Sequence, residues 1–205
     1  MSSFRDVLLT HRETLNLLNV YPVPDGDTGS NMAATLGSVI AELDEISAES
    51  GLDAVAGAIA HGSLMGARGN SGVILSQVLR GLMGVLAGAG VVVDGRMVAG
   101  GMAAASTAAY EAVGRPVEGT ILTVVREASE AAVEAADAGV DLLAVAEAAR
   151  EAGGRSLERT PELLPVLAEA GVVDAGGYGF ILFLDALLTE VDGRPLPEAP
   201  EPPAK

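Results

Sequence analysis

Apolar residues recur at helical spacing from one end of this 205-residue chain to the other. Residues three or four positions apart lie on one face of an α-helix, whereas the strict alternation typical of β-strands is scarce here. The clearest helical runs are Phe4, Val7, Leu8, Leu15 and Leu18; Leu36, Val39, Ile40 and Leu43; Leu75, Val78, Leu79, Leu82 and Leu86; and Ile121, Val124, Val125, Ala128 and Ala132. The sequence therefore predicts an all-α fold.

Gly, Pro and Asp residues interrupt this periodicity and set the expected helix boundaries. They predict helices over residues 4–18, 29–46, 52–66, 71–88, 95–113, 120–138, 141–159 and 176–190, with a short one near 162–169. Composition agrees, because a chain with 49% hydrophobic but only 3% aromatic residues suits close-packed helices better than a β-sandwich.

One domain is expected over residues 1–193, followed by a different kind of segment. Residues 194–205 hold half of the 10 prolines and almost nothing apolar. We expect this segment to be extended and solvated, either as a terminal tail or as the start of a linker.

Charge and composition exclude several classes of function. The net charge of −16 argues against a nucleic-acid partner, because phosphate neutralisation needs clustered Lys and Arg. The absence of Cys excludes disulfides, thiolate metal sites and a Cys nucleophile. The first residues lack the pattern of a secretory signal, and the uncharged stretch 81–93 is shorter than the ~20 residues of a membrane helix. We therefore expect a cytoplasmic protein without a membrane span.

The stretch over residues 19–31, Asn-Val-Tyr-Pro-Val-Pro-Asp-Gly-Asp-Thr-Gly-Ser-Asn, is the most informative one. Two prolines stiffen a loop that carries Asp25 and Asp27 just before an expected helix start. A helix N-terminus with small polar side chains offers backbone N–H groups to an anion. Mg²⁺ typically takes one or two protein carboxylates and completes its shell with waters and phosphates. The stretch therefore indicates a cation held between carboxylates and a phosphate.

This stretch has two other interpretations. A calcium-binding EF-hand fails, because with Asp25 at position 1 the residue at position 6 is Ser30 instead of Gly, and position 12 is Leu36 instead of Glu. A simple turn with a helix N-cap fits the same residues and stays open as the alternative.

A second glycine-rich stretch, Gly-Ser-Leu-Met-Gly-Ala-Arg-Gly-Asn-Ser-Gly over residues 62–72, also precedes an apolar helix. Its turn can bring backbone N–H groups close to a phosphate, with Asn70 and Ser71 adding side-chain hydrogen bonds. It is not a P-loop, because the only lysine of the chain is Lys205. An ordinary turn between two helices remains the alternative interpretation.

Two further turns, over residues 116–120 and 172–179, place Gly and a polar side chain at expected helix starts. Each alone fits a helix cap as well as a site. If all these starts met at one end of a helical bundle, they would form a pocket for a Mg²⁺-bound polyphosphate.

Together the four motifs resemble the N-terminal, ATP-binding domain (DAK2 or DhaL-like) of the bacterial fatty acid kinase catalytic subunit, which is related to the nucleotide-binding subunit of dihydroxyacetone kinase. The resemblance covers roughly residues 4–190 and rests on residues 19–32, 65–77, 116–124 and 171–177. It implies a closed barrel of about eight antiparallel helices, with Mg²⁺-ATP bound in the loops at one end.

The resemblance also implies roles for single residues. Asp25 and Asp27 would be the catalytic residues that hold Mg²⁺ against the phosphates, with Asn19 as a third metal ligand. Residues implied to contact the nucleotide are Ser30, Asn31, Gly69, Asn70 and Ser71 at the phosphates, Gly119 and Thr120 in the pocket wall, and Asp174, Gly176 and Gly177 in a loop over it.

As a function, the resemblance implies transfer of the ATP γ-phosphate to a fatty acid carboxylate presented by a separate fatty-acid-binding partner protein. Such a carboxylate is already ionised at neutral pH, so the reaction needs alignment and charge neutralisation rather than a general base. Two alternatives stay open: a nucleotide-binding subunit of a dihydroxyacetone-type kinase, and a non-catalytic nucleotide-binding domain.

Overall fold

The structure, a computed structural model, describes residues 1–88 and 92–200, and every regular element in these two ranges is an α-helix. The helices are α1 (Ser2–Thr10), α2 (Arg12–Leu17), α3 (Thr28–Asp44), α4 (Leu52–Gly66), α5 (Gly69–Leu86), α6 (Gly95–Glu111), α7 (Ile121–Asp137), α8 (Leu142–Glu158), α9 (Thr160–Leu163), α10 (Pro165–Ala170) and α11 (Ala175–Asp192). The all-α prediction is confirmed.

Two expected helices are each divided in the structure. The first bends at His11, whose backbone leaves ideal helix geometry with φ −94° and ψ 5°. The short helix expected near 162–169 becomes α9 and α10, because Leu164 is extended, with φ −126° and ψ 102°. Pro165 follows Leu164, and a proline disfavours the helical conformation of the residue before it.

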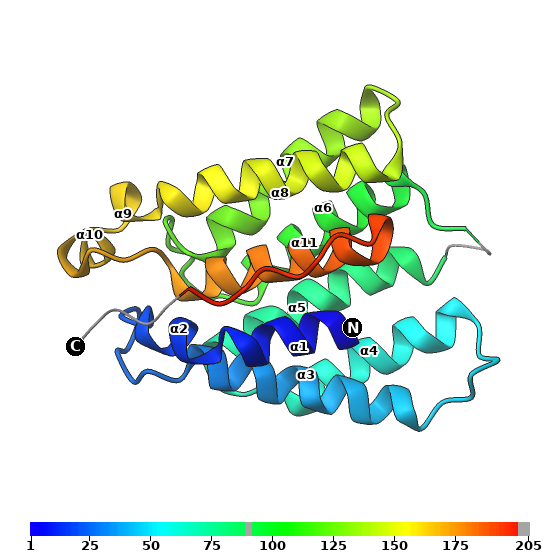
Figure 1. Cartoon of the computed structure of the whole chain (residues 1–205), viewed down its shortest axis with the longest axis horizontal. Coiled ribbons are helices and arrows are strands. Elements are labelled where there is room, and N and C mark those ends of the chain that lie inside the picture. The colour runs from blue at the N-terminus through cyan, green and yellow to red at the C-terminus, as the bar shows by residue number, and fades with distance from the viewer. Residues whose placement is uncertain (89–91, 201–205) are drawn as a thin grey trace.

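The long helices close into a ring. Each helix from α3 to α8 packs against the next along the chain, α11 packs against α8, and α1 closes the ring between α11 and α3 (Figure 1). Taking α1 and α2 as one bent helix, the ring has eight members within the described residues, as a closed antiparallel barrel of about eight helices requires.

Small residues let neighbouring helices of the ring approach closely. A Cβ atom on Gly81 of α5 would lie 2.6 Å from the carbonyl oxygen of Ala104 on α6. A Cβ on Gly101 of α6 would lie 2.6 Å from the Leu82 side chain of α5. The high Gly and Ala content is thus the composition that backbone-to-backbone helix packing needs.

The proline-rich segment after α11 lies along the barrel instead of standing in solvent. It has no regular secondary structure through Pro200, and Figure 1 shows it running back past α11 and α1. Leu196 packs against the hydrophobic core, and the Pro197 carbonyl oxygen lies 3.0 Å from Nε2 of His11. The expectation of a fully solvated tail therefore does not hold at these two residues.

Among the described residues, no helix is both long and apolar enough to cross a lipid bilayer.

Candidate functional site

The four glycine-rich motifs meet at one end of the barrel. Successive long helices run antiparallel, so α3, α5, α7 and α11 all begin at the same end, on the left in Figure 1. The loop over residues 19–27 and the short helices α9 and α10 lie at this end too (Figure 1). The structure therefore brings the predicted site residues to one end of the fold, which we call the motif end.

The loop before α3 is held by two asparagines of the preceding segment. Asn19 is buried, and its Oδ1 accepts hydrogen bonds from the backbone N–H groups of Asp27 and Thr28, both at 3.1 Å. Asn16 Oδ1 accepts from the N–H of Ser30 at 3.1 Å, and Asn16 Nδ2 donates to Ser30 Oγ at 3.1 Å. Asn16 and Asn19 thus satisfy N–H groups that an N-cap side chain normally serves.

This arrangement leaves both aspartates of the loop unengaged. Asp27 occupies the N-cap position of α3, yet its carboxylate makes no capping hydrogen bond. Across the part of the chain that the structure describes, neither Asp25 nor Asp27 has a side-chain hydrogen bond or an ion pair. Asp25 is exposed and Asp27 is half-buried. A loop that served only as a turn with a cap would use the Asp27 carboxylate as the cap.

The donor set fits a hard divalent cation. Mg²⁺ prefers carboxylate oxygens and keeps several waters, so two free carboxylates at a solvent-facing loop suffice for it. No group of three or more His, Cys, Asp or Glu that could hold a metal occurs in residues 1–88 and 92–200. Asn19 has both lone pairs of its oxygen directed at backbone N–H groups, so we assign it to ordering the loop.

The start of α5 is open. Arg68 stands at the N-cap position without a side-chain capping bond, and Gly69 enters the helix with φ +57°, a conformation that favours glycine. Asn70 is exposed and Ser71 is half-buried. Within the described residues the Arg68 guanidinium donates only to the carbonyl oxygen of Ala67, at 3.1 Å. This end of α5 therefore presents uncapped N–H groups and one cation to solvent, which favours an anion.

The starts of α3 and α5 touch each other. A Cβ on Gly69 would overlap Nδ2 of Asn31 on α3, so the two helix starts are in contact at this point. Thr35 Oγ1 donates to the Asn31 carbonyl at 2.8 Å and accepts the N–H of Arg68 at 3.3 Å. The start of α3, which Asn16 and Asn19 hold, and the uncapped start of α5 thus form one continuous surface with Ser30, Asn31, Asn70 and Ser71, which we call the open half.

The start of α7 is closed by its own residues. Thr120 is buried and caps α7, accepting from the N–H of Leu122 at 3.4 Å. Gly119, also buried, donates its N–H to Thr123 Oγ1 at 2.8 Å. Gly119 has φ +81°, and its hypothetical Cβ would lie 2.9 Å from the Thr160 carbonyl oxygen, so α9 packs closely against this loop. Gly119 and Thr120 therefore pack against neighbours.

A polar network supports this loop from outside. Glu118 accepts from Thr123 Oγ1 at 2.7 Å, from the Tyr110 hydroxyl at 2.9 Å and from Arg126 at 3.2 Å. Partial burial raises the pKa of Glu118, but the hydrogen bonds from Thr123, Tyr110 and Arg126 hold it below its usual value. The network fixes the loop between α6 and α7.

The start of α11 is closed by a buried carboxylate. Asp174 is 6% exposed, and its Oδ2 accepts from the N–H of Gly177 at 2.7 Å. Burial raises the pKa of Asp174 to about 6, against the opposing effect of backbone hydrogen bonds from Gly177, Ile121 and Gly176. Since Ile121 is the first residue of α7, Asp174 joins the starts of α7 and α11. We call these two capped starts the closed half.

Four residues of the motif end carry structural contacts that the sequence analysis missed: Asn16, Thr35, Thr123 and Thr160. Each lies inside or beside a helix with strong apolar periodicity, and each bonds to a residue of a different element or loop. A polar residue on an otherwise apolar helix face was the only available signal, and it does not identify the partner.

Comparison with known proteins identifies a family and several similar proteins. A family model described as the DAK2 domain matches residues 22–189. Protein YloV of Bacillus subtilis (strain 168) is 41% identical over 191 residues, which is 93% of this chain and 34% of that protein. The uncharacterized protein SSP1546 of Staphylococcus saprophyticus is 42% identical over 187 residues, which is 91% of this chain and 34% of that protein. The chain thus spans about a third of the length of these curated relatives.

A solved structure shares the fold. The dihydroxyacetone kinase of C. freundii in its native form superposes with a TM-score of 0.61 at 22% sequence identity, over 92% of this chain and 34% of that one. At this identity the similarity establishes the helical fold.

Proposed function

This chain belongs to the DAK2 domain family, and on that premise we propose that it is a cytoplasmic, Mg²⁺-dependent, ATP-binding kinase domain. It transfers the γ-phosphate of ATP to the carboxylate of a fatty acid, which a separate fatty-acid-binding partner protein presents. The product is an acyl phosphate.

One observation carries the proposal: among the residues that the structure describes, the carboxylates of Asp25 and Asp27 have no partner, and the helix that follows them adjoins the uncapped start of α5. Asn16 and Asn19 take over the capping of α3, and the Asn31 side chain lies against Gly69 at the start of α5. Carboxylates for a cation and N–H groups for an anion thus belong to two adjoining helix starts, and this combination supports binding of a metal-bound polyphosphate.

The charge of the chain supports a metal bridge. With 28 acidic against 12 basic residues, the protein repels a free polyphosphate. Mg²⁺ held by Asp25 and Asp27 would neutralise phosphate charge during transfer. On the protein side, the N–H groups at the start of α5, the side chains of Asn70 and Ser71, and the Arg68 guanidinium orient the phosphates for in-line attack.

The geometry of the barrel favours an acceptor that comes from outside. An apolar cavity of about 150 Å³, lined by residues such as Leu82, Met102 and Phe183, lies between α1, α5, α6 and α11. Leu82 is 13 residues after Gly69 on α5, about 20 Å along the helix axis. An acyl chain in that cavity would be remote from the motif end, which supports delivery of the carboxylate by a partner protein.

A phosphoryl-transfer assay tests the proposal. The chain, and separately any longer gene product, is incubated with Mg²⁺ and ATP labelled in the γ-phosphate. One arm contains a fatty acid on its lipid-binding protein, and the other contains dihydroxyacetone on its substrate-binding subunit. Label in an acyl phosphate, with hydroxylamine converting that product to the acyl hydroxamate and releasing the labelled phosphate, supports the proposal. Label in dihydroxyacetone phosphate identifies the other kinase type, and nucleotide binding without transfer in either arm identifies a non-catalytic domain.

A further inference from the structure

We propose that Thr160 and Asp174 are positioning residues that lock the starts of α7 and α11 together and so fix one wall of the nucleotide pocket before nucleotide arrives. The inference rests on the proposed function, because it assigns these residues a role in the same pocket. Asp174 then acts on the nucleotide indirectly, through the position of the two helices, and not by direct contact. Thr160 lies outside all four motifs and is a new member of the site.

Thr160 ties three elements together. Its side chain is completely buried, on the short helix α9. Its Oγ1 donates to the carbonyl oxygen of Leu157, near the end of α8, at 2.7 Å. The same oxygen accepts the backbone N–H of Asp174, just before α11, at 3.1 Å. One hydroxyl therefore connects α8, α9 and α11.

Asp174 continues this connection to α7. Its carboxylate accepts the N–H of Gly177 in the first turn of α11 and also interacts with the N–H groups of Gly176 and Ile121. Ile121 is the first residue of α7. A buried carboxylate satisfied by backbone N–H groups of two helices holds those helices in one relative position, because moving either would strand a buried charge.

Packing around glycine reinforces the same contact. Gly119 meets the Thr160 carbonyl oxygen and the side chains of Leu163 and Leu164, each at 2.9 Å from its hypothetical Cβ. A Cβ on Gly176 would lie 3.2 Å from the Ile121 side chain. Residues of α9 therefore pack against the turn that leads into α7, and Thr160 bonds to Asp174 in the turn that leads into α11.

Burial separates this role from ligand binding. Thr160 is 0% and Asp174 6% exposed, so neither side chain offers a surface to nucleotide. The N–H groups of Gly177 and Leu122 are occupied by Asp174 and Thr120 and are not free for a phosphate. The closed half shapes the pocket, whereas the open half binds the phosphates.

The test compares matched threonine variants of this chain. Thr160→Val removes the hydroxyl and keeps the shape, Thr160→Ser keeps the hydroxyl, and Thr189→Val is the control. Thr189 Oγ1 bonds only to the Asp185 carbonyl of its own helix within the described residues, on the half of α11 remote from the motif end. We measure the Kd of Mg²⁺-ATP by calorimetry and the melting temperature of each variant.

We expect Thr160→Val to raise the Kd roughly 2- to 10-fold in a folded protein, as the loss of a buried hydrogen bond predicts. Thr160→Ser restores wild-type affinity, and the control changes Kd less than about 2-fold. A Thr160→Val protein that is folded and binds Mg²⁺-ATP normally overturns the inference, whatever its melting temperature. Absence of Mg²⁺-ATP binding by the wild type instead overturns the proposed function, and this inference with it.

Hydrogen exchange of the wild type decides the question if Thr160→Val does not fold. In nucleotide-free protein the amides of Ile121, Gly176 and Gly177 should exchange as slowly as those of the core helices. Exchange that is fast without nucleotide and slow only with Mg²⁺-ATP would show a wall formed on binding, which overturns the inference.

Discussion

The open and the closed half of the motif end both consist of glycine-rich turns that precede helices. They differ in which side chains accept hydrogen bonds from the first N–H groups of those helices. In the open half, Asn16 and Asn19 from the preceding segment bond to the N–H groups of α3, and α5 has no side-chain cap. In the closed half, Thr120 and Asp174 cap their own helices and are buried. A glycine-rich turn before a helix therefore has two possible uses, and neighbouring side chains decide between them.

The difference has an electrostatic consequence. A helix start attracts an anion only while its N–H groups are available. At α11 the Asp174 carboxylate, a part of the fold itself, takes that position, and the structure leaves the corresponding position at α5 to solvent within the described residues. The comparison predicts that changes in the open half act on nucleotide binding, and that changes in the closed half act on stability or pocket shape.

The largest expected effect is in the open half. Asp25→Ala or Asp27→Ala should weaken Mg²⁺-ATP binding by about 2 to 5 kcal/mol, because each removes a charge that faces the metal. The melting temperature of the nucleotide-free protein should stay level or rise slightly, since two neighbouring carboxylates repel each other. Calorimetry and a thermal melt on the same variants check both.

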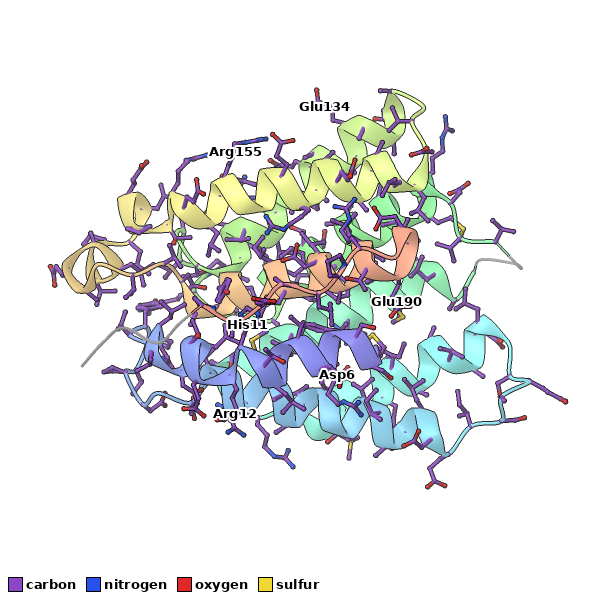
Figure 2. All side chains as sticks on the ribbon, viewed as in Figure 1. Asp6, His11, Arg12, Glu134, Arg155 and Glu190 are labelled. Atoms are coloured by element: carbon purple, nitrogen blue, oxygen red, sulfur yellow. The ribbon has the colours of Figure 1, made fainter. Side chains whose placement is uncertain are left out.

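Glu134→Ala is the control for these variants, because it removes an equal charge from the outer face of α7, where Figure 2 shows Glu134 pointing away from the barrel. Variants of Asp25 and Asp27 that melt lower and bind normally would favour the turn-and-cap interpretation of this loop.

A glycine substitution should have the largest effect in the closed half. Gly119→Ala places a Cβ 2.9 Å from a backbone oxygen at φ +81°, and we expect a loss of about 2 to 4 kcal/mol in the free energy of unfolding. Gly139 has a similar φ of +79° and open space around its Cβ, so Gly139→Ala should cost only about 1 kcal/mol. Urea denaturation of both variants measures the difference, and equal losses would contradict the close packing of α9.

The pH dependence of stability should also come from the closed half. The pKa of Asp174 is about 6 in the folded protein, above its usual value, so the folded state holds this proton more tightly than the unfolded state. The contribution of Asp174 to stability is therefore present at low pH and is lost as pH rises from about 4 to about 6, on the order of 3 kcal/mol in total.

Asp174→Asn isolates this effect, because the variant cannot titrate. The difference in unfolding free energy between wild type and Asp174→Asn should change across this pH range and be flat above pH 7. A difference that is constant from pH 4 to pH 7 would mean that Asp174 titrates normally.

The smallest expected effect concerns the polar side chains of α5. Asn70→Ala and Ser71→Ala should each weaken Mg²⁺-ATP binding by about 0.5 to 3 kcal/mol without lowering the melting temperature. Ser47→Ala, in the exposed loop at the opposite end of the barrel, is the control and should leave binding unchanged. A sharp fall in the melting temperature of Asn70→Ala would assign Asn70 to the closed type of helix start.

Local patterns predicted much of this molecule. Apolar periodicity and the Gly, Pro and Asp stops predict nearly every helix to within a few residues, and each of the four motifs indicates a helix start. Periodicity could not show that the four starts meet, because that depends on packing between distant helices. Nor could it separate the two halves, since Asn16 and Thr160 act on residues 14 positions away along the chain.

The proline-rich segment limits prediction in another way. Its composition predicts a solvated segment, yet Leu196 packs against the core and the Pro197 carbonyl oxygen lies next to His11. Figure 2 shows His11 between α1 and α11. One apolar residue and one carbonyl group do not form a sequence pattern, so the sequence alone does not predict that this segment packs against the barrel.

The attachment of this segment has a mechanical meaning. Arg194 is paired with Glu147 of α8 at 2.7 Å, Leu196 sits on the core, and the Pro197 carbonyl meets His11, whose Nδ1 lies 2.9 Å from the Tyr178 hydroxyl of α11. A force that pulls on the chain after Pro197 is transmitted through these contacts to α1, α8 and α11. It reaches the last turn of α11 only after the contacts break. Tension applied there therefore acts across the helices of the barrel wall and not only along the axis of α11.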